Sequence, residues 1–192
     1  MVRALVGAVA GAIAMFIIGF IFFATPLSKL GIGTLDDVRA AAVRQALAAN
    51  LPQTATYYVP DPSTRAQSEM YSRGPVAMIR YNMKGFAPSD PAAMIGGFVH
   101  MLIVSLLIAW FLWLLARYVH SFAEQVKITG IVILGTTIFI RLGDPIWDHM
   151  DWTYSIYTLV ADVAMLGTAA LIILKLLPQQ AAATPASADG GR

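Results

Sequence analysis

Two ionisable residues, Arg141 and Asp162, stand inside stretches of sequence that are otherwise apolar. A charge at the depth of a lipid bilayer costs several kcal/mol unless a partner compensates it, so such residues mark a structural pair or a functional site. Arg141 precedes Trp147 by six residues, about 9 Å along a helix. Asp162 follows Trp152 by ten residues, about 15 Å along the next helix. The depth difference of about 6 Å is within the reach of an arginine side chain if a tight turn joins the two helices.

We therefore predict that Arg141 and Asp162 form an intramembrane ion pair that fixes the register of this helical hairpin. Three other interpretations stay open. Asp162 could be protonated and hydrogen-bonded to a threonine or tyrosine, or the pair could contact another chain. The pair could also belong to a proton or ion relay, although a relay with one acid and one base has no second acid along its path.

The densest polar cluster of the sequence follows Arg141, in the turn WDHMDW and just before it. Carboxylate oxygens suit hard divalent cations, and imidazole adds a capacity for transition metals. The candidate ligands for a metal or cofactor are His100, Asp144, Asp148, His149 and Asp151. Their spacing matches no established metal motif, so we favour an interfacial belt made by Trp147 and Trp152, with the acids keeping the turn in water.

The three histidines do not form an evident pair of haem ligands. His100 is expected near the outer end of its helix, His120 about 30 Å away at the inner end, and His149 in a turn. His100 alone could supply one axial bond to a haem or pigment. We expect instead a hydrogen-bonded histidine at the helix end, and no cofactor.

Composition places the chain among integral membrane proteins. Apolar residues make up 58% of its 192 residues, and charged residues only 12%, against roughly 25% in soluble domains. This excludes a disordered chain, a nucleic-acid-binding tail and an ordinary soluble enzyme. Cysteine is absent, which excludes disulfides, thiol redox pairs and iron–sulfur clusters.

Long gaps between charges predict four transmembrane helices, since about 20 apolar residues are needed to cross a bilayer. The expected spans are 4–24, 94–116, 127–147 and 152–176, the third with Arg141 inside it. The first apolar stretch is longer than that of a signal peptide, so residues 1–24 are expected to be a retained helix. Residues 94–177 then hold the second to fourth helices.

Residues 25–93 are too structured in pattern to be a linker. Thr34 and Asp37 resemble a capping box for a helix over 35–50, and 54–59 and 75–83 alternate as the two strands of a hairpin over about 54–83. The fold class predicted is thus an all-α membrane protein with a small α+β extracytoplasmic cap. Residues 178–192 are of low complexity and are expected to be a disordered cytoplasmic tail.

Two further patterns suit packing or binding. Gly7 and Gly11 form a small-xxx-small pair that permits close approach of another helix. Trp110 and Trp113 are expected to face lipid or the interhelical core, the alternative being a quinone or lipid groove. No hydrolase, kinase or nucleotide-binding motif is present in the sequence.

The positive-inside rule favours cytoplasmic termini, because basic residues outnumber acidic ones on that side, and a bacterial inner membrane is the simplest host. The sequence predicts a non-catalytic accessory, scaffold or assembly subunit of a larger membrane protein complex. Its expected partners are membrane lipid and other subunits or a second copy, and not nucleic acid. The alternatives are a cofactor-, quinone- or metal-binding redox subunit and a small transporter or ion pathway.

Overall fold

The computed structural model describes residues 2–177 and divides into two compact units. The helical unit comprises the chain up to Ile32 and from Pro91 onward, and the cap comprises residues 33–90. Residues 25–32 and 91–93, which the sequence assigned to the cap, therefore belong to the helical unit. The predicted tail over 178–192 lies outside the described residues.

Four helical segments of the helical unit are long and apolar enough to cross a membrane. They are α1 (Val2–Ala24), α4 (Pro91–Leu115), the segment Phe122–Trp147 and α7 (Trp152–Leu176). These are the lengths and hydropathies of the helices of an integral membrane protein, and their apolar side chains suit contact with lipid.

The third segment is not one continuous helix. Helix α5 (Phe122–Arg141) ends where Leu142 intervenes, and the short α6 (Gly143–Trp147) follows. Pro145 explains the break, because its ring would clash with the carbonyl of Arg141 four residues earlier and it has no N–H to donate. Helix α5 also begins five residues before the predicted start at 127, since the Ser121 hydroxyl accepts a hydrogen bond from the backbone N–H of Glu124 at 3.5 Å.

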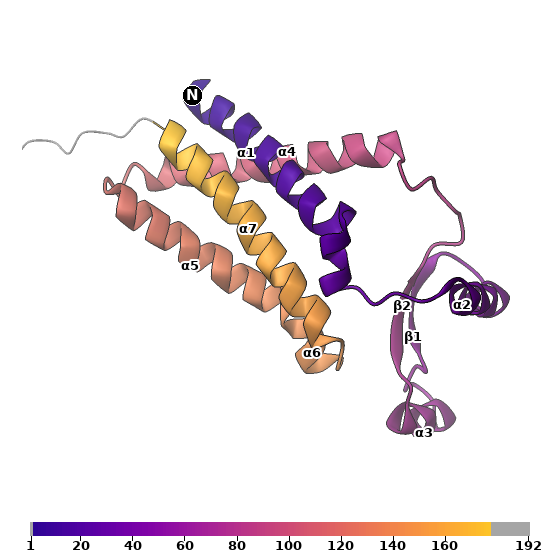
Figure 1. Ribbon diagram of the computed structural model, residues 1–192. Coiled ribbons are helices and arrows are strands. Elements are labelled where there is room, and N and C mark those ends of the chain that lie inside the picture. Colours follow the sequence, from indigo (N-terminus) through magenta and orange to yellow (C-terminus); the bar gives the residue numbers. More distant parts are fainter. Residues whose placement is uncertain (1, 178–192) are drawn as a thin grey trace, which may run out of the picture. The chain divides into compact units, whose positions relative to one another are not determined.

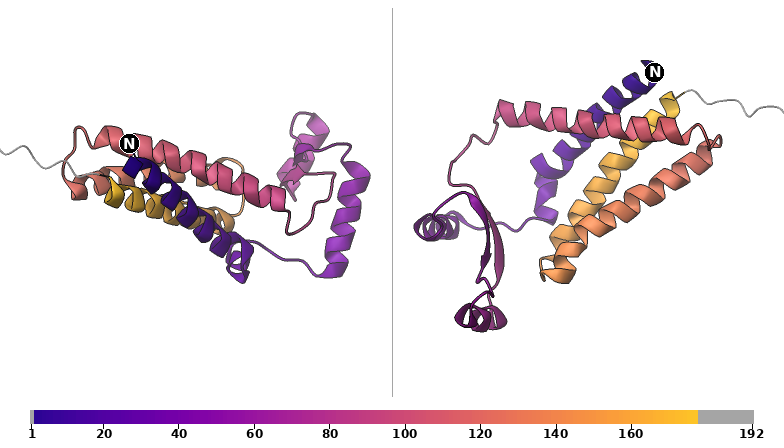
Figure 2. Two further views of the ribbon diagram at one scale, coloured as in Figure 1. Left: turned by 90° about the horizontal axis from the view of Figure 1, so that it is seen from above. Right: turned by 180° about the vertical axis from the view of Figure 1, so that it is seen from behind.

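Helix α1 packs along α7, and α4 crosses α1 (Figures 1 and 2). Small residues permit the close approach to α7. A Cβ on Gly7 would lie 3.3 Å from the Cα of Ile173, and a Cβ on Gly11 would lie 3.3 Å from the Cβ of Ala169. The Gly11 Cβ would also meet the Ser105 hydroxyl of α4 at 2.7 Å, so both glycines lie where helices touch.

The far end of α1 is fixed to α7 through a tyrosine. The Tyr157 hydroxyl donates a hydrogen bond to the carbonyl of Phe22 over 2.5 Å, and the two rings lie 5.6 Å apart between centroids. The chain then turns through the 3-10 helix η1 (Pro26–Leu30), and Gly31 lies against the Tyr157 ring. An aromatic contact and a partly buried hydrogen bond thus join two segments that are far apart in sequence.

The cap begins with α2 (Asp37–Asn50). Its N-cap is Asp36, whose carboxylate accepts a hydrogen bond from the backbone N–H of Arg39 at 2.8 Å. Asp36 therefore has the capping role that the sequence pattern assigned to Thr34, and the helix begins two residues later than position 35. Aspartate is among the most favourable N-cap residues, which gives the physical reason for this start.

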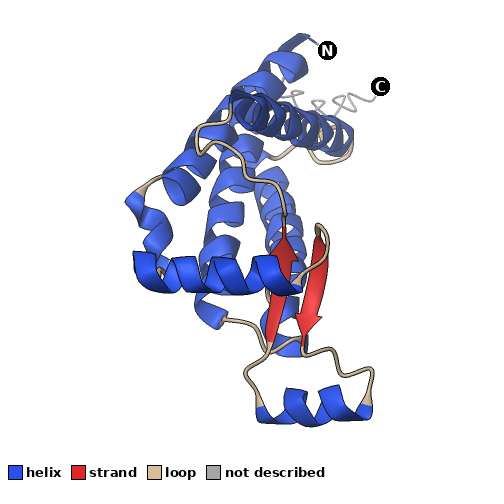
Figure 3. Cartoon of the chain, turned by 90° about the vertical axis from the view of Figure 1, so that its right-hand side faces the viewer, coloured by secondary structure: helices blue, strands red, loops and turns tan. Residues whose placement is uncertain are grey.

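Strands β1 (Ala55–Val59) and β2 (Ala77–Tyr81) pair antiparallel, with Tyr57 opposite Ile79 (Figure 3). They are shorter than the predicted strands. The segment between them is not made of turns alone, because it contains α3 (Arg65–Arg73). Thr64 caps the start of α3, and Gly74, at a φ of +66°, follows its end in a conformation that glycine adopts readily.

The cap has no core of its own. The structure describes all of residues 33–90, and not one of them is buried. Helix α2 is exposed along nearly its whole length, and Val38 is 80% exposed. In the helical unit, by contrast, Ala12, Leu112 and Ile173 are completely buried.

Candidate functional site

The structure brings Arg141 and Asp162 into direct contact. Arg141 is the last residue of α5, and Asp162 lies near the middle of α7. The Nε atom of Arg141 donates to Oδ2 of Asp162 over 2.6 Å, and the side chains are 34% and 17% exposed. An arginine–carboxylate hydrogen bond of this length is charge-assisted, and each group compensates the charge of the other in a partly buried position.

Neighbouring polar groups add to the setting of this pair. Asp144 and Tyr154 lie close enough to interact electrostatically with Arg141. Two hydroxyl groups of α7 are engaged elsewhere: Thr158 donates to the carbonyls of Tyr154 and Ser155, and Tyr157 donates to α1. The hydrogen bond to Asp162 thus comes from Arg141 rather than from Thr158 or Tyr157.

The other candidate ligands lie in and around the turn between α6 and α7, apart from His100, which is exposed on α4. Asp144 is exposed in α6, and His149 is exposed with a left-handed φ of 52°. Among residues 2–177, no three His, Cys, Asp or Glu side chains are grouped so that they could hold a metal ion. A metal site in this turn would need at least one ligand that the present arrangement of side chains does not supply.

Asp151 has a clear local role as the N-cap of α7. Its carboxylate accepts hydrogen bonds from the backbone N–H groups of Thr153 at 3.0 Å and of Tyr154 at 3.1 Å. Both hydrogen bonds hold the pKa of the Asp151 carboxyl below its usual value, and the bond from Thr153 has the larger effect. The charged carboxylate therefore stabilises the start of α7.

This capping predicts a pH dependence. Because the pKa of Asp151 is lower in the folded state, its contribution is complete above the unfolded value of about 3.9 and is lost as the pH falls through the folded value. The melting temperature of the detergent-solubilised protein, followed by circular dichroism, should fall more between pH 5 and pH 2 for the parent than for Asp151→Asn. Asparagine also caps helices but does not titrate. Equal decreases in the two proteins would contradict this role.

Trp147 and Trp152 flank the same turn. Trp147 ends α6 and is 81% exposed, and Trp152 begins α7 and is also exposed. Exposed indole rings at the ends of apolar helices are suited to the membrane–water interface, where the ring is half in lipid and the N–H can reach water.

Two contacts of the helical unit were not anticipated from the sequence. One is the contact of Tyr157 with Phe22 and Gly31. The other is a cation–π contact in which the guanidinium carbon of Arg117 lies 3.7 Å from the centroid of the Trp113 ring. The sequence held a signal for the Tyr157 contact, because a tyrosine hydroxyl within an apolar helix must find an acceptor. A signal for the second was the spacing of four residues between Trp113 and Arg117.

Comparison with protein-family models found no match, and comparisons with curated proteins and with solved structures found none either. The function is therefore inferred from the residues and their geometry. The features available for this are the Arg141–Asp162 pair, the coreless cap and the distribution of charge over the helical unit.

Proposed function

We propose that this chain is a non-catalytic accessory, scaffold or assembly subunit of a larger membrane protein complex, and that its cap binds a partner protein. The observation that carries the proposal is that none of residues 33–90 is buried although they form two helices and a hairpin. This segment has the secondary structure of a folded domain but no buried hydrophobic core.

Folding energetics explain why this observation points to a partner. Fixing the backbone of each residue costs about 1–2 kcal/mol, which is offset mainly by burial of apolar surface. A two-stranded hairpin is marginal in water by itself, and a segment of this size with no cysteine has no disulfide to hold it. A covering surface would supply the missing burial.

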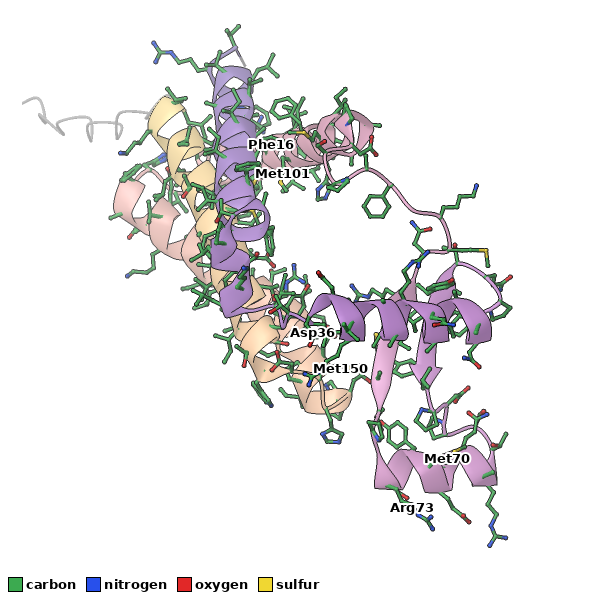
Figure 4. All side chains as sticks on the ribbon, turned by 45° about the vertical axis from the view of Figure 1, so that its right-hand side comes forward. Phe16, Asp36, Met70, Arg73, Met101 and Met150 are labelled. Carbon is green, nitrogen blue, oxygen red and sulfur yellow. The ribbon has the colours of Figure 1, made fainter. Side chains whose placement is uncertain are left out.

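The chemistry of the cap surface suits a protein partner. Tyrosine and methionine are enriched at interfaces, and the cap exposes Tyr58, Met70 and Met83. A pocket of about 590 Å³ opens between β1 and α3, and its lining includes Tyr58, Met70 and Arg73. Figure 4 labels Met70 and Arg73 on α3. A pocket of this size could receive an anchor side chain of a partner.

Charge supports the proposed orientation. One end of the helical unit consists of the N-terminal ends of α1 and α5 and the C-terminal ends of α4 and α7. Within the described residues, this end carries four basic residues and one acidic residue, a net charge of +3. These residues are Arg3, Arg117, Lys127, Lys175 and Glu124. By the positive-inside rule this end faces the cytoplasm, so both termini are cytoplasmic, and a bacterial inner membrane is the simplest host.

Purification of the tagged full chain from native membranes in mild detergent tests the proposal. We expect a partner at a fixed stoichiometry and a colourless eluate. Met70→Glu should abolish the association because it places a charge in the pocket of the cap. Ser68→Glu adds the same charge at an exposed position of the same helix outside that pocket, so it should leave the association intact.

Other outcomes would support the alternatives. An eluate with visible absorption would favour a redox subunit with a haem or pigment and would contradict the proposal. A solitary colourless protein that conducts ions in liposomes would favour an ion pathway, for which the Arg141–Asp162 pair is the supporting observation. Equal partner binding by Met70→Glu and the parent would exclude the pocket as the binding surface.

A further inference from the structure

An apolar groove lies between the N-terminal end of α1 and the C-terminal half of α4. The groove has a volume of about 460 Å³, within the range of ligand sites in proteins. Val2, Ala4 and Leu5 of α1 form one wall. Trp110 and Trp113 contribute to the other wall, which belongs to α4. Apolar walls of this kind fit a hydrocarbon chain better than a polar metabolite.

A cation is held against one wall of this groove. The guanidinium group of Arg117 lies over the Trp113 ring at 3.7 Å, and Trp113 lines the groove. Arg117 is otherwise exposed. The cation–π contact therefore holds a positive charge beside a residue that lines the groove.

The surrounding charge indicates the sign of that polar end. Arg117 belongs to the end of the helical unit that carries a net charge of +3 among the described residues. The acidic residue of this end, Glu124, lies on α5, which does not line the groove. A ligand with an apolar chain and an anionic head would therefore complement both the walls and the mouth of the groove.

We propose that this groove binds an anionic phospholipid, with one acyl chain between α1 and α4 and the phosphate at Arg117. Arginine binds phosphate through paired N–H groups, and a basic side chain near a membrane surface contributes about 1 kcal/mol to the binding of acidic lipid. A zwitterionic lipid offers the same chain without net negative charge. The site involves the helical unit alone and does not depend on the proposed role of the cap.

Fluorescence quenching can test this site. The chain has four tryptophans, so the double variant Trp147→Phe/Trp152→Phe leaves Trp110 and Trp113 as the emitters. The full chain is reconstituted into phosphatidylcholine vesicles with an equal mole fraction of either brominated phosphatidylglycerol or brominated phosphatidylcholine. We expect stronger quenching by the brominated phosphatidylglycerol, and the ratio of the two gives the preference for the anionic lipid.

Two variants, each of which removes one positive charge, locate the site. Arg117→Gln should reduce the preference about five-fold, the change that corresponds to ~1 kcal/mol for one basic side chain. Lys127→Gln removes one positive charge from the same end, but on α5, and should keep the preference of the parent. Because the preference is a ratio of two lipids in the same variant, an effect of Arg117 on the emission of Trp113 cancels.

Three results would overturn the proposal. Equal quenching by the two brominated lipids would show no selectivity for charge. Equal losses in Arg117→Gln and Lys127→Gln would assign the preference to the charge of the whole surface. An absence of quenching by either lipid would show that a partner helix or a second copy of the chain covers the groove. Circular dichroism of each variant establishes that the helices are intact.

Discussion

Asp162→Leu is expected to destabilise the helical unit by about 3 kcal/mol, because it removes the carboxylate that is hydrogen-bonded to the partly buried Arg141. The parent pair is joined by one hydrogen bond of 2.6 Å, and removal of either partner leaves an uncompensated charge. Unfolding by sodium dodecyl sulfate in mixed micelles, followed by circular dichroism, measures the loss.

The double variant Arg141→Leu/Asp162→Leu is the decisive control. It removes both charges, so we expect a stability within about 1 kcal/mol of the parent, as for ion pairs replaced by apolar residues of similar size. Arg141→Leu alone should resemble Asp162→Leu, and the cycle gives the coupling energy. Additive losses in the double variant would contradict the pairing. Asp162→Asn tests the relay separately, since a variant that assembles and functions normally leaves no place for proton transfer at this carboxylate.

Gly31→Ala is expected to lower stability by about 2 kcal/mol. The backbone of Gly31, with φ −114° and ψ −16°, is open to any residue, so the effect is purely steric. An added Cβ would lie 2.5–2.6 Å from Cγ, Cβ and Cδ1 of Tyr157. Cβ and Cγ are at the root of the side chain and cannot turn away, so η1 or α7 must shift. Thermal unfolding in detergent measures the change.

Gly33→Ala is the matched control for Gly31→Ala. Within the part of the chain that the structure describes, nothing lies within 4 Å of a Cβ at Gly33, so its melting temperature should equal that of the parent. Tyr157→Phe separates sterics from hydrogen bonding, because it keeps the ring and loses the bond to the Phe22 carbonyl, at about 1 kcal/mol. Equal melting temperatures for the two glycine variants would contradict the contact between η1 and Tyr157.

The membrane-spanning helices could be predicted from the sequence because charge gaps and helix length are local properties. Helix α7 has the predicted bounds, Trp152–Leu176. The third segment differs because Pro145 ends the helix, and Arg141, Gly143 and Asp144 already interrupt the hydrophobic pattern before Ile146 and Trp147 resume it. Helix α3 was missed because it is short and only Ala66, Met70 and Tyr71 of its nine residues are apolar, although Thr64 and Gly74 stand at its two ends as capping signals.

Contacts between distant segments could be predicted from the sequence only in part. The approach of Arg141 and Asp162 could be anticipated, since a tight turn sets the depth of both residues in one hairpin. The contact of Gly31 with Tyr157 and the groove beside Trp113 depend on how α1 crosses α4 and α7. Periodicity along one helix carries no information about that crossing, so the contact of Gly31 required the three-dimensional arrangement, and a groove at Trp113 could be named from the sequence only as an alternative.

The packing of α1 on α7 also bears on how the chain is made. Gly11 leaves the ribosome 158 residues before Ala169, the residue it lies against. At about 5–20 residues per second, the first helix waits roughly 10–30 s in the membrane before its main neighbour is synthesised. Until α4 supplies the Ser105 contact and α7 later supplies the Ala169 contact, this glycine face is open to lipid or to an insertion factor that shields it. The glycine face of α1 is therefore covered in two steps, first by α4 and then by α7.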